Sequence, residues 1–194
     1  MLHIMPHWNW PDKIGQNILL RVFSNCKQVE LFLNGKSRGK QEMKPDWFLD
    51  WNVKYEPGVL EAKGYDANGK LTLETKDETT GEPTAIQLSP DRTQINANGE
   101  DCSVINVSIV DAQGRVVPTA DNLIHFELSG PGKIIGVGNG DPSCHEPDKC
   151  EGNWQRSAFN GYAQVIVQSS TRSGSLRLTA TSPRGANIVI QITI

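Results

Sequence analysis

The sequence lacks any long run of apolar residues and any excess of positive charge. No apolar stretch approaches the roughly 20 residues of a membrane-spanning helix, so no membrane span is predicted. With 19 Lys and Arg against 22 Asp and Glu, the net charge is −3 and no basic patch stands out, which argues against nucleic-acid binding. The first residues also lack the basic region, apolar run and small-residue cleavage site of a signal peptide.

The short motifs of common enzyme classes are missing as well. The chain has no G-x-S-x-G, no H-E-x-x-H and no Walker loop, and no serine stands in a recognisable nucleophile setting with a histidine and an acid. The acidic residues lie mostly in turns or alternate outward along strands, with no pair set up for glycoside hydrolysis. His3 and His7 are four residues apart, but Pro6 between them argues against a shared helical face that would bind a metal. We therefore predict no catalytic residue, no cofactor and no metal.

Cysteine is scarce, and its spacing matches no zinc site. Of the four cysteines, Cys144 and Cys150 share one polar loop, where they either form a local disulfide in an oxidising compartment or remain thiols. Cys26 and Cys102 are expected to be buried thiols.

The abundant feature is apolar–polar alternation with a period of two, and no convincing helical period interrupts it. Asn34-Gly35 and Asn68-Gly69 are strong turn signals between the alternating segments. Trp47, Leu49, Trp51 and Val53 alternate with polar residues, so we expect both tryptophans of this segment to pack in a core. Short strands with closely spaced turns are typical of antiparallel β-sandwiches.

The polar stretch KDETTGEPTA, residues 76–85, breaks this pattern and has no large apolar residue, which predicts a linker. Alternation resumes at Ile86 and continues to Ile194, where an apolar-faced strand should be paired and should complete the second domain. The chain is therefore predicted to be all-β, with two sandwiches in tandem over residues 1–82 and 83–194.

Two irregular segments carry the candidate contact residues. The opening stretch MLHIMPHWNWP holds two tryptophans, which are costly to expose unless they touch something. We expect Trp8 and Trp10 to differ, one anchoring the first sandwich and the other remaining partly exposed or lying in a contact between molecules.

The second segment, GNGDPSCHEPDKCEGNW at residues 138–154, is long for a sandwich connection. It is a solvated loop, a contact with a neighbouring domain, or a calcium site built from its acidic residues Asp141, Glu146, Asp148 and Glu151. The residues that we single out for contact with another domain or with a sugar are His7, Trp8, Trp10, Asn139, Asp141 and Trp154.

Several stretches resemble a known family. HIMPHWNWP, SNCKQVELFLNGKSRGK and PGVLEAKGYDANGK resemble the segment that follows the catalytic (β/α)₈ barrel in bacterial glycoside hydrolase family 2 enzymes of the β-galactosidase type. LSPDRTQINANGEDCSVINVSIVDAQGRVVP, GVGNGDPSCHEP and RSAFNGYAQVIVQSS resemble the domain that comes next. VELFLNGKS and GVGNGDP are the most specific of these parts. The resemblance implies that both sandwiches are immunoglobulin-like.

The resemblance further implies a non-catalytic, C-terminal fragment of a hydrolase that cleaves terminal β-linked sugars by a retaining mechanism. The barrel and both catalytic glutamates of such an enzyme lie outside this sequence, so no catalytic residue carries over. The implied partners are that barrel, on which the PHWNW aromatics would pack, a second copy of the chain, and carbohydrate through the parent enzyme. The implied location of the parent is periplasmic or extracellular. A stand-alone carbohydrate-binding module acting through exposed tryptophans, or a structural immunoglobulin-like spacer, are the alternatives.

Overall fold

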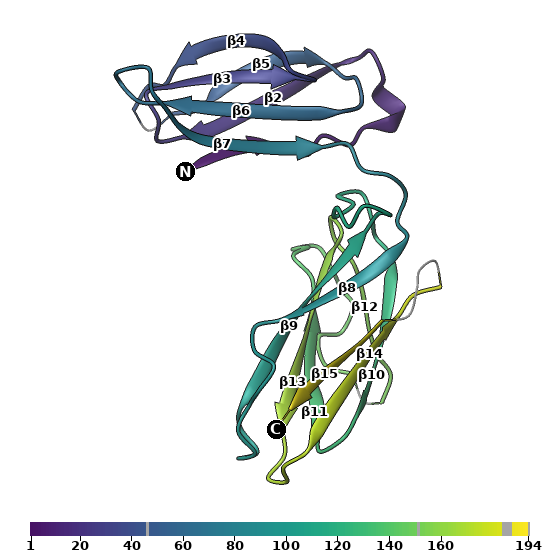
Figure 1. Ribbon diagram of the computed structural model, residues 1–194. Helices are drawn as coiled ribbons and strands as arrows, with labels where there is room; N and C mark the ends of the chain where they lie inside the picture. Colours follow the sequence, from purple (N-terminus) through teal and green to yellow (C-terminus); the bar gives the residue numbers. More distant parts are fainter. Residues whose placement is uncertain (46, 151, 184–187, 194) are drawn as a thin grey trace. The chain divides into compact units, whose positions relative to one another are not determined.

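The computed structural model describes residues 1–45, 47–150, 152–183 and 188–193 (Figure 1). The fold is all-β, as predicted, and apart from one short 3-10 turn its elements are antiparallel strands. The chain divides into two compact units, Met1–Thr79 and Thr80–Ile194. The predicted domain boundary, after Glu82, lies slightly later in the sequence than this division. The first part of the predicted linker belongs to a strand that runs to Glu78. No helix among the described residues has the length and apolar character needed to cross a membrane.

The N-terminal unit consists of two sheets that share one core. Its elements are β1 (Leu2–Met5), η1 (Pro11–Lys13), β2 (Asn17–Ser24), β3 (Gln28–Leu33), β4 (Lys36–Glu42), β5 (Leu49–Lys54), β6 (Val59–Tyr65) and β7 (Leu71–Glu78). The strand orders are β1-β2-β5 and β4-β3-β6-β7. Between β3 and β4 the turn is Asn34-Gly35, with positive φ at both residues, as a tight two-residue hairpin requires. Alternate residues such as Leu20, Val22 and Leu31 then fall on the inner faces and are fully buried.

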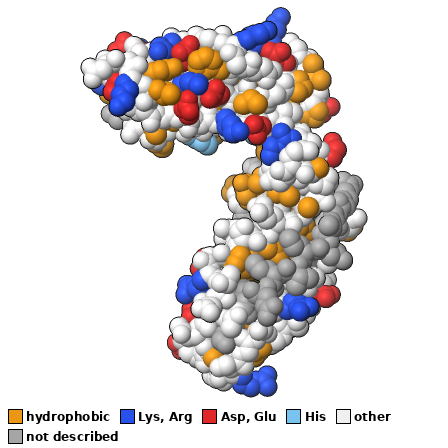
Figure 2. All heavy atoms as spheres, viewed as in Figure 1, with side chains coloured by type: hydrophobic (Ala, Val, Ile, Leu, Met, Phe, Trp, Pro, Cys, Tyr) orange, Lys and Arg blue, Asp and Glu red, His pale blue; other side chains and the backbone are white. Residues whose placement is uncertain are grey.

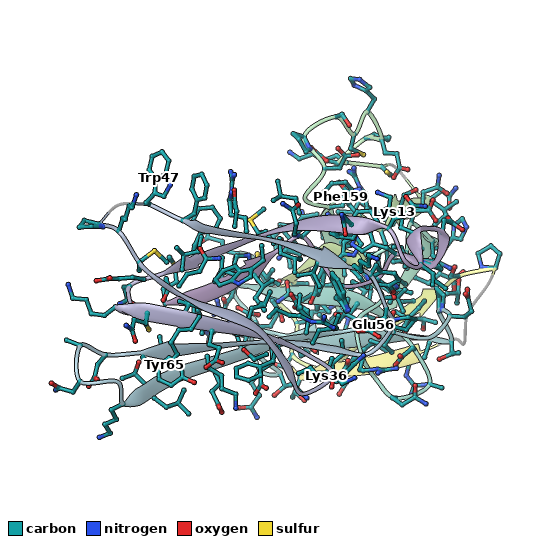
Figure 3. All side chains as sticks on the ribbon, turned by 90° about the horizontal axis from the view of Figure 1, so that it is seen from above. Lys13, Lys36, Trp47, Glu56, Tyr65 and Phe159 are labelled. Carbon is teal, nitrogen blue, oxygen red and sulfur yellow. The ribbon has the colours of Figure 1, made fainter. Side chains whose placement is uncertain are left out.

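Trp47 contradicts the expectation that this tryptophan packs in the core. Its side chain is 60% exposed, whereas Trp51 is buried at 6%. The physical reason is that β5 begins only at Leu49, so the two-residue period of the strand does not extend back to Trp47. Outside the strand, the Trp47 ring stacks on Phe48 with 4.9 Å between ring centroids, and Figure 3 shows it at the edge of the unit.

The C-terminal unit is a second sandwich of two four-stranded sheets. Its strands are β8 (Ala85–Pro90), β9 (Cys102–Val110), β10 (Leu123–Ser129), β11 (Gly132–Gly138), β12 (Trp154–Ser157), β13 (Tyr162–Ser169), β14 (Ser175–Thr181) and β15 (Ile188–Thr193). The strand orders are β12-β10-β14-β15 and β11-β13-β9-β8. The predicted final strand is present as β15 and pairs with β14, while Ile194 lies outside the described residues. The prediction of two tandem immunoglobulin-like sandwiches is confirmed.

All four cysteines are free thiols, so the local disulfide between Cys144 and Cys150 is not formed in this structure. Each sulfur has a different partner: Cys144 Sγ accepts a hydrogen bond from Arg156 Nη1 at 3.0 Å, and Cys150 Sγ donates to the Pro147 carbonyl at 3.5 Å. Cys26 and Cys102 are half-buried rather than buried. Both lie close to the end of a strand, where the core no longer covers a side chain on both sides.

Asp111 fixes the turn after β9 and the start of the C-terminal unit. Its buried carboxylate accepts hydrogen bonds from the backbone N–H groups of Gly81, Gln113 and Arg115 and from the Arg115 guanidinium. Burial by itself raises the pKa of this carboxyl, but the Arg115 guanidinium and the three N–H groups outweigh it and hold the pKa well below its usual range.

Asp111→Asn is therefore expected to lower the urea midpoint of the C-terminal unit near neutral pH and to flatten its acid dependence. Because the folded pKa is depressed, the carboxylate stabilises the fold above its unfolded pKa of about 3.9 and loses this contribution as the pH falls. Urea titrations between about pH 7 and 2.5, with the exposed Asp121→Asn as control, test this expectation. Equal acid dependence in the wild type and Asp111→Asn would contradict it.

Candidate functional site

The opening aromatic segment, residues 7–13, is attached to the N-terminal unit through Trp8. This side chain is 1% exposed, and its Nε1 donates to the Glu56 carbonyl at 3.1 Å. The indole packs edge-on against Tyr55, with 4.9 Å between ring centroids. The Trp8 carbonyl accepts a hydrogen bond from Thr79 Oγ1 at 2.8 Å, so the segment is tied to the last residue of the unit. Trp8 is the anchor of this segment.

Trp10 is only half-buried and stands in a small stack with His7 and Lys13. The His7 and Trp10 rings are stacked at 4.5 Å, and Lys13 Nζ lies 4.1 Å from the Trp10 ring centroid (Lys13 is labelled in Figure 3). Trp10 Nε1 donates to the His7 carbonyl at 2.9 Å, and His7 Nδ1 accepts from the Asn9 N–H at 3.2 Å. Burial and the Lys13 charge lower the pKa of His7, so its imidazole is neutral at pH 7. The expectation that Trp8 and Trp10 differ is confirmed.

The described residues of the loop 138–154 fold around one buried cation, Arg156 on β12. Only 2% of the Arg156 side chain is exposed. Its Nη2 donates to the Val137 carbonyl at 3.1 Å and to Asp148 Oδ1 at 2.6 Å, in addition to the bond from Nη1 to Cys144. Arg156 Nε lies 3.9 Å from Glu146 Oε2, a distance suited to charge attraction but too long for a hydrogen bond.

Three other polar residues of this loop, Asn139, Asp141 and Glu146, hydrogen-bond to backbone groups of the loop or of β12. Asn139 Nδ2 donates to the Ser157 carbonyl at 2.9 Å, and Asn139 Oδ1 accepts from the Asp141 N–H at 3.2 Å. The Asp141 carboxylate accepts from the Ser143 N–H and hydroxyl, which lowers its pKa. Glu146 accepts from the Ser157 N–H at 2.8 Å; burial raises the pKa of Glu146, but the Ser157 hydroxyl and N–H bring it below its usual value.

The structure thus brings the predicted residues together in two groups. His7, Trp8 and Trp10 form one group on the N-terminal unit, while Asn139 and Asp141 lie in the loop of the C-terminal unit. Trp154, at the end of that loop, is half-buried against the core. In the described part of the chain, no three His, Cys, Asp or Glu side chains are gathered in a way that would hold a metal ion. Glu151, one of the acids considered for calcium, lies outside the described residues.

Several carboxyl groups of the described residues stabilise turns and strands through local hydrogen bonds. Hydrogen bonds to Arg, to backbone N–H groups or to hydroxyls lower the pKa values of Asp50, Asp91, Asp101, Asp111, Asp141 and Glu146. Among the described carboxyl groups with a resolved shift, Asp77 is the one whose pKa is raised, and burial is the cause. A glycosidase needs two carboxyl groups across one bond, one of them with a raised pKa. Asp77 lies on β7, and the charged group that acts on it among the described residues is His3 rather than another carboxyl group.

Sequence reasoning missed Arg156. The available signal is that Arg156 occupies an inward position of a short strand that directly follows an acidic loop. Because a fully buried arginine needs partners, the acids at 146 and 148 are the natural candidates.

Comparison with known proteins gives matches over most of the chain. Residues 86–190 match the family described as "Glycoside hydrolase family 2 C-terminal domain 5", and residues 15–73 match "Domain of unknown function (DUF4982)". The β-galactosidase BoGH2A of Bacteroides ovatus is 39% identical over 194 residues, which cover 99% of this chain and 22% of that protein. A β-glucuronidase of Formosa agariphila is 33% identical over 190 residues, covering 94% of this chain and 18% of that protein.

The crystal structure of a glycosyl hydrolase family 2 member from Bacteroides cellulosilyticus superposes with a TM-score of 0.92 at 35% identity. The superposition covers 99% of this chain and 28% of that one. The chain therefore spans about a fifth of the length of the curated relatives that it matches.

Proposed function

The chain belongs to glycoside hydrolase family 2, to its C-terminal region, and from this premise we propose that it is a non-catalytic part of a glycosidase that supports the catalytic barrel. One observation carries the proposal: nearly the whole chain aligns with a β-galactosidase, yet it accounts for only 22% of that enzyme. The carboxyl groups described above stabilise turns and strands, and this use is consistent with a supporting role.

The proposed contact with the barrel is the opening aromatic segment. Trp8 anchors the segment, while the half-buried Trp10 keeps part of its ring available. On either side in the sequence, Met5 and Ile14 are 47% and 66% exposed. Large apolar side chains that remain exposed on a surface are typical of a protein contact.

The proposed parent activity is β-galactosidase, with β-glucuronidase as the second candidate. The alignment with a β-galactosidase is longer and has higher identity than that with the β-glucuronidase. The 33% identity to the β-glucuronidase over almost the whole chain is the observation that favours the second candidate.

A stand-alone sugar module acting through a row of tryptophans has less support. Trp8 and Trp51 are buried, Trp10 and Trp154 are half-buried, and Trp47 is exposed outside any strand. These rings therefore do not present a continuous flat platform of the kind that such a module uses.

We expect the 194-residue chain to release no nitrophenol from aryl β-galactosides or aryl β-glucuronides above the buffer blank. The physical reason is that, among the described carboxyl groups with a resolved pKa shift, the only raised one, Asp77, has burial as its first cause and no carboxyl group among its causes. Turnover that survives repurification and co-elutes with the chain would overturn the non-catalytic assignment.

The barrel contact is tested in a chimera, in which this chain replaces the matching segment of the Bacteroides ovatus β-galactosidase. Trp10→Ala is expected to lower the temperature of half-inactivation of the chimera by a few degrees, because an apolar ring at a protein contact is then lost. Trp47→Ala, an exposed ring on the same unit, is the matched control and should leave that temperature unchanged. Equal effects of the two changes would contradict the assigned contact.

A further inference from the structure

A groove of about 630 Å³ lies against the C-terminal unit, on the sheet β11-β13-β9-β8. The side chains that line it include Ser89, Asn106, Ser108, Asn139, Tyr162 and Gln164. They come from three strands and from the loop that Arg156 holds. The groove is separate from the aromatic segment of the proposed barrel contact, which belongs to the other unit.

The pairing register aligns the polar groups of the groove in rows across the sheet. Gly138 pairs with Gln164, Gln164 with Asn106, and Asn106 with Ser89, so one row crosses all four strands. In the next row Tyr162 pairs with Ser108. Because neighbouring strands are about 4.8 Å apart, the first row extends over about 14 Å. This length suits an extended ligand rather than a single ion.

The lining carries no Asp, Glu, Lys, Arg or His, which sets it apart from the outer surface of the other unit. There, Lys40 pairs with Glu30, and Lys63 pairs with both Glu61 and Glu74. Figure 2 shows charges of both signs over the N-terminal unit. A surface of amides and hydroxyls without charge fits a ligand that is rich in hydroxyl groups and is itself neutral.

The two amides of the first row are already oriented. Gln164 Nε2 donates to Asn106 Oδ1 at 2.9 Å. This bond leaves the Asn106 amide N–H groups as donors and Gln164 Oε1 as an acceptor at the exposed surface of the sheet. One donor and one acceptor side by side match the vicinal hydroxyl groups of a sugar ring.

Tyr162 supplies an aromatic surface on a rigid support. Its side chain is 51% exposed. It ends a tight turn in which Asn160 and Gly161 have positive φ, and Phe159 and Tyr162 exchange two backbone hydrogen bonds of 2.8 and 3.0 Å (Phe159 is labelled in Figure 3). A β-carbon at Gly161 would lie 2.4 Å from the Val117 carbonyl oxygen, so the turn is closely packed against its neighbour. A fixed, exposed ring beside polar groups is suited to stack on the apolar face of a pyranose.

The floor and the rim of the groove leave room for a ligand to come close to the backbone. Gly138, Gly140 and Ala163 line it and present little side chain. Asn139 at the rim is held by its bond to the Ser157 carbonyl, so the loop does not need to order on binding.

We propose that this groove binds a neutral oligosaccharide, with Tyr162 stacking on one ring and Gln164 and Asn106 hydrogen-bonding its hydroxyl groups. The site is non-catalytic and would hold the chain, and any enzyme that contains it, on a glycan. It does not depend on the barrel contact, because all its residues lie within the C-terminal unit.

The test is an NMR titration of the ¹⁵N-labelled 194-residue chain with β-1,4-galactotetraose, cellotetraose and, as an acidic comparator, tetragalacturonate. At least one neutral probe is expected to saturate with a Kd of about 1 mM or lower, with shifts at residues 162–164 and 106. Tyr162→Ala should weaken this binding about tenfold, and Tyr162→Phe should retain it. Trp47→Ala, which removes an exposed ring from the other unit, should leave it unchanged.

Gln164→Ala and Asn106→Ala give an independent test through exposed side chains, should Tyr162→Ala disturb the turn. Each is expected to weaken binding several-fold without moving the thermal midpoint. The proposal is overturned if neither neutral probe saturates at about 10 mM, if the acidic probe binds more tightly, or if binding survives all three alanine changes. None of these outcomes bears on the barrel contact, which the chimera tests separately.

Discussion

Trp8→Ala is expected to destabilise the N-terminal unit by about 3–5 kcal/mol, the usual cost of deleting a large buried aromatic side chain. The indole is 1% exposed and contacts a core to which both sheets contribute. Its removal leaves a cavity, breaks the bond from Nε1 to the Glu56 carbonyl and takes away the edge-on partner of Tyr55.

The measurement is urea unfolding followed by resolved backbone NMR signals of residues 17–78, because the two units need not unfold together. Trp8→Phe should cost less, since a ring remains, and should lose mainly the hydrogen bond, worth about 1 kcal/mol. Trp47→Ala is the matched control: its ring is 60% exposed, and we expect a change below about 0.5 kcal/mol. If Trp8→Ala and Trp47→Ala had equal effects, Trp8 would not be the anchor.

Alternation in the sequence predicted many of the strands and their inner faces, but it missed β1 within the opening stretch and gave no sign of β11. Leu20, Leu31 and Ile105 are placed on the inner face by the two-residue period alone, and the structure buries all three completely. Asn34-Gly35 predicts its hairpin because few other residue pairs accept two successive positive φ angles. These predictions succeed because the local preference of each segment agrees with the structure that it adopts in the complete fold.

The same rule fails where a strand ends or where a partner is distant in sequence. Trp47 continues the alternation of β5 but lies outside the strand, and the period carries no information on where a strand begins. Cys144 and Cys150 are near each other in the chain, yet each finds another partner once the loop is folded. The rows of Gln164, Asn106 and Ser89 depend on the register between strands far apart in the sequence, which no single segment specifies.

Arg156→Ala is expected to destabilise the C-terminal unit by about 3 kcal/mol. The side chain is buried and supplies hydrogen bonds to the Val137 carbonyl, Cys144 Sγ and Asp148. Removing the side chain leaves the buried Val137 carbonyl without this donor. It also leaves a cavity at the position around which the loop folds. The estimate lies at the low end for breaking a buried ion pair, because Asp148 is 81% exposed and regains water once Arg156 is gone.

Two further variants separate the contribution of burial from that of charge. Asp148→Asn removes the closest charge partner, but since that carboxylate is mostly in water we expect a loss below about 1 kcal/mol. Arg156→Lys keeps the charge but loses the planar fork that reaches several acceptors, so its loss should fall between those of Asp148→Asn and Arg156→Ala. Urea unfolding followed by NMR signals of residues 102–138 gives all three values.

The loop itself provides a readout that a general loss of stability would not give. Cys144 Sγ receives a hydrogen bond from Arg156, and the Asn139 amide lies 3.8 Å from the same sulfur. Under native conditions, alkylation of Cys144 by iodoacetamide should therefore be slow in the wild type and several-fold faster in Arg156→Ala, while Cys26, in the other unit, serves as the internal reference. Equal Cys144 rates in the two proteins would show that the loop holds its conformation without Arg156. Faster alkylation would show that one buried cation orders the loop, and with it the Asn139 rim of the groove.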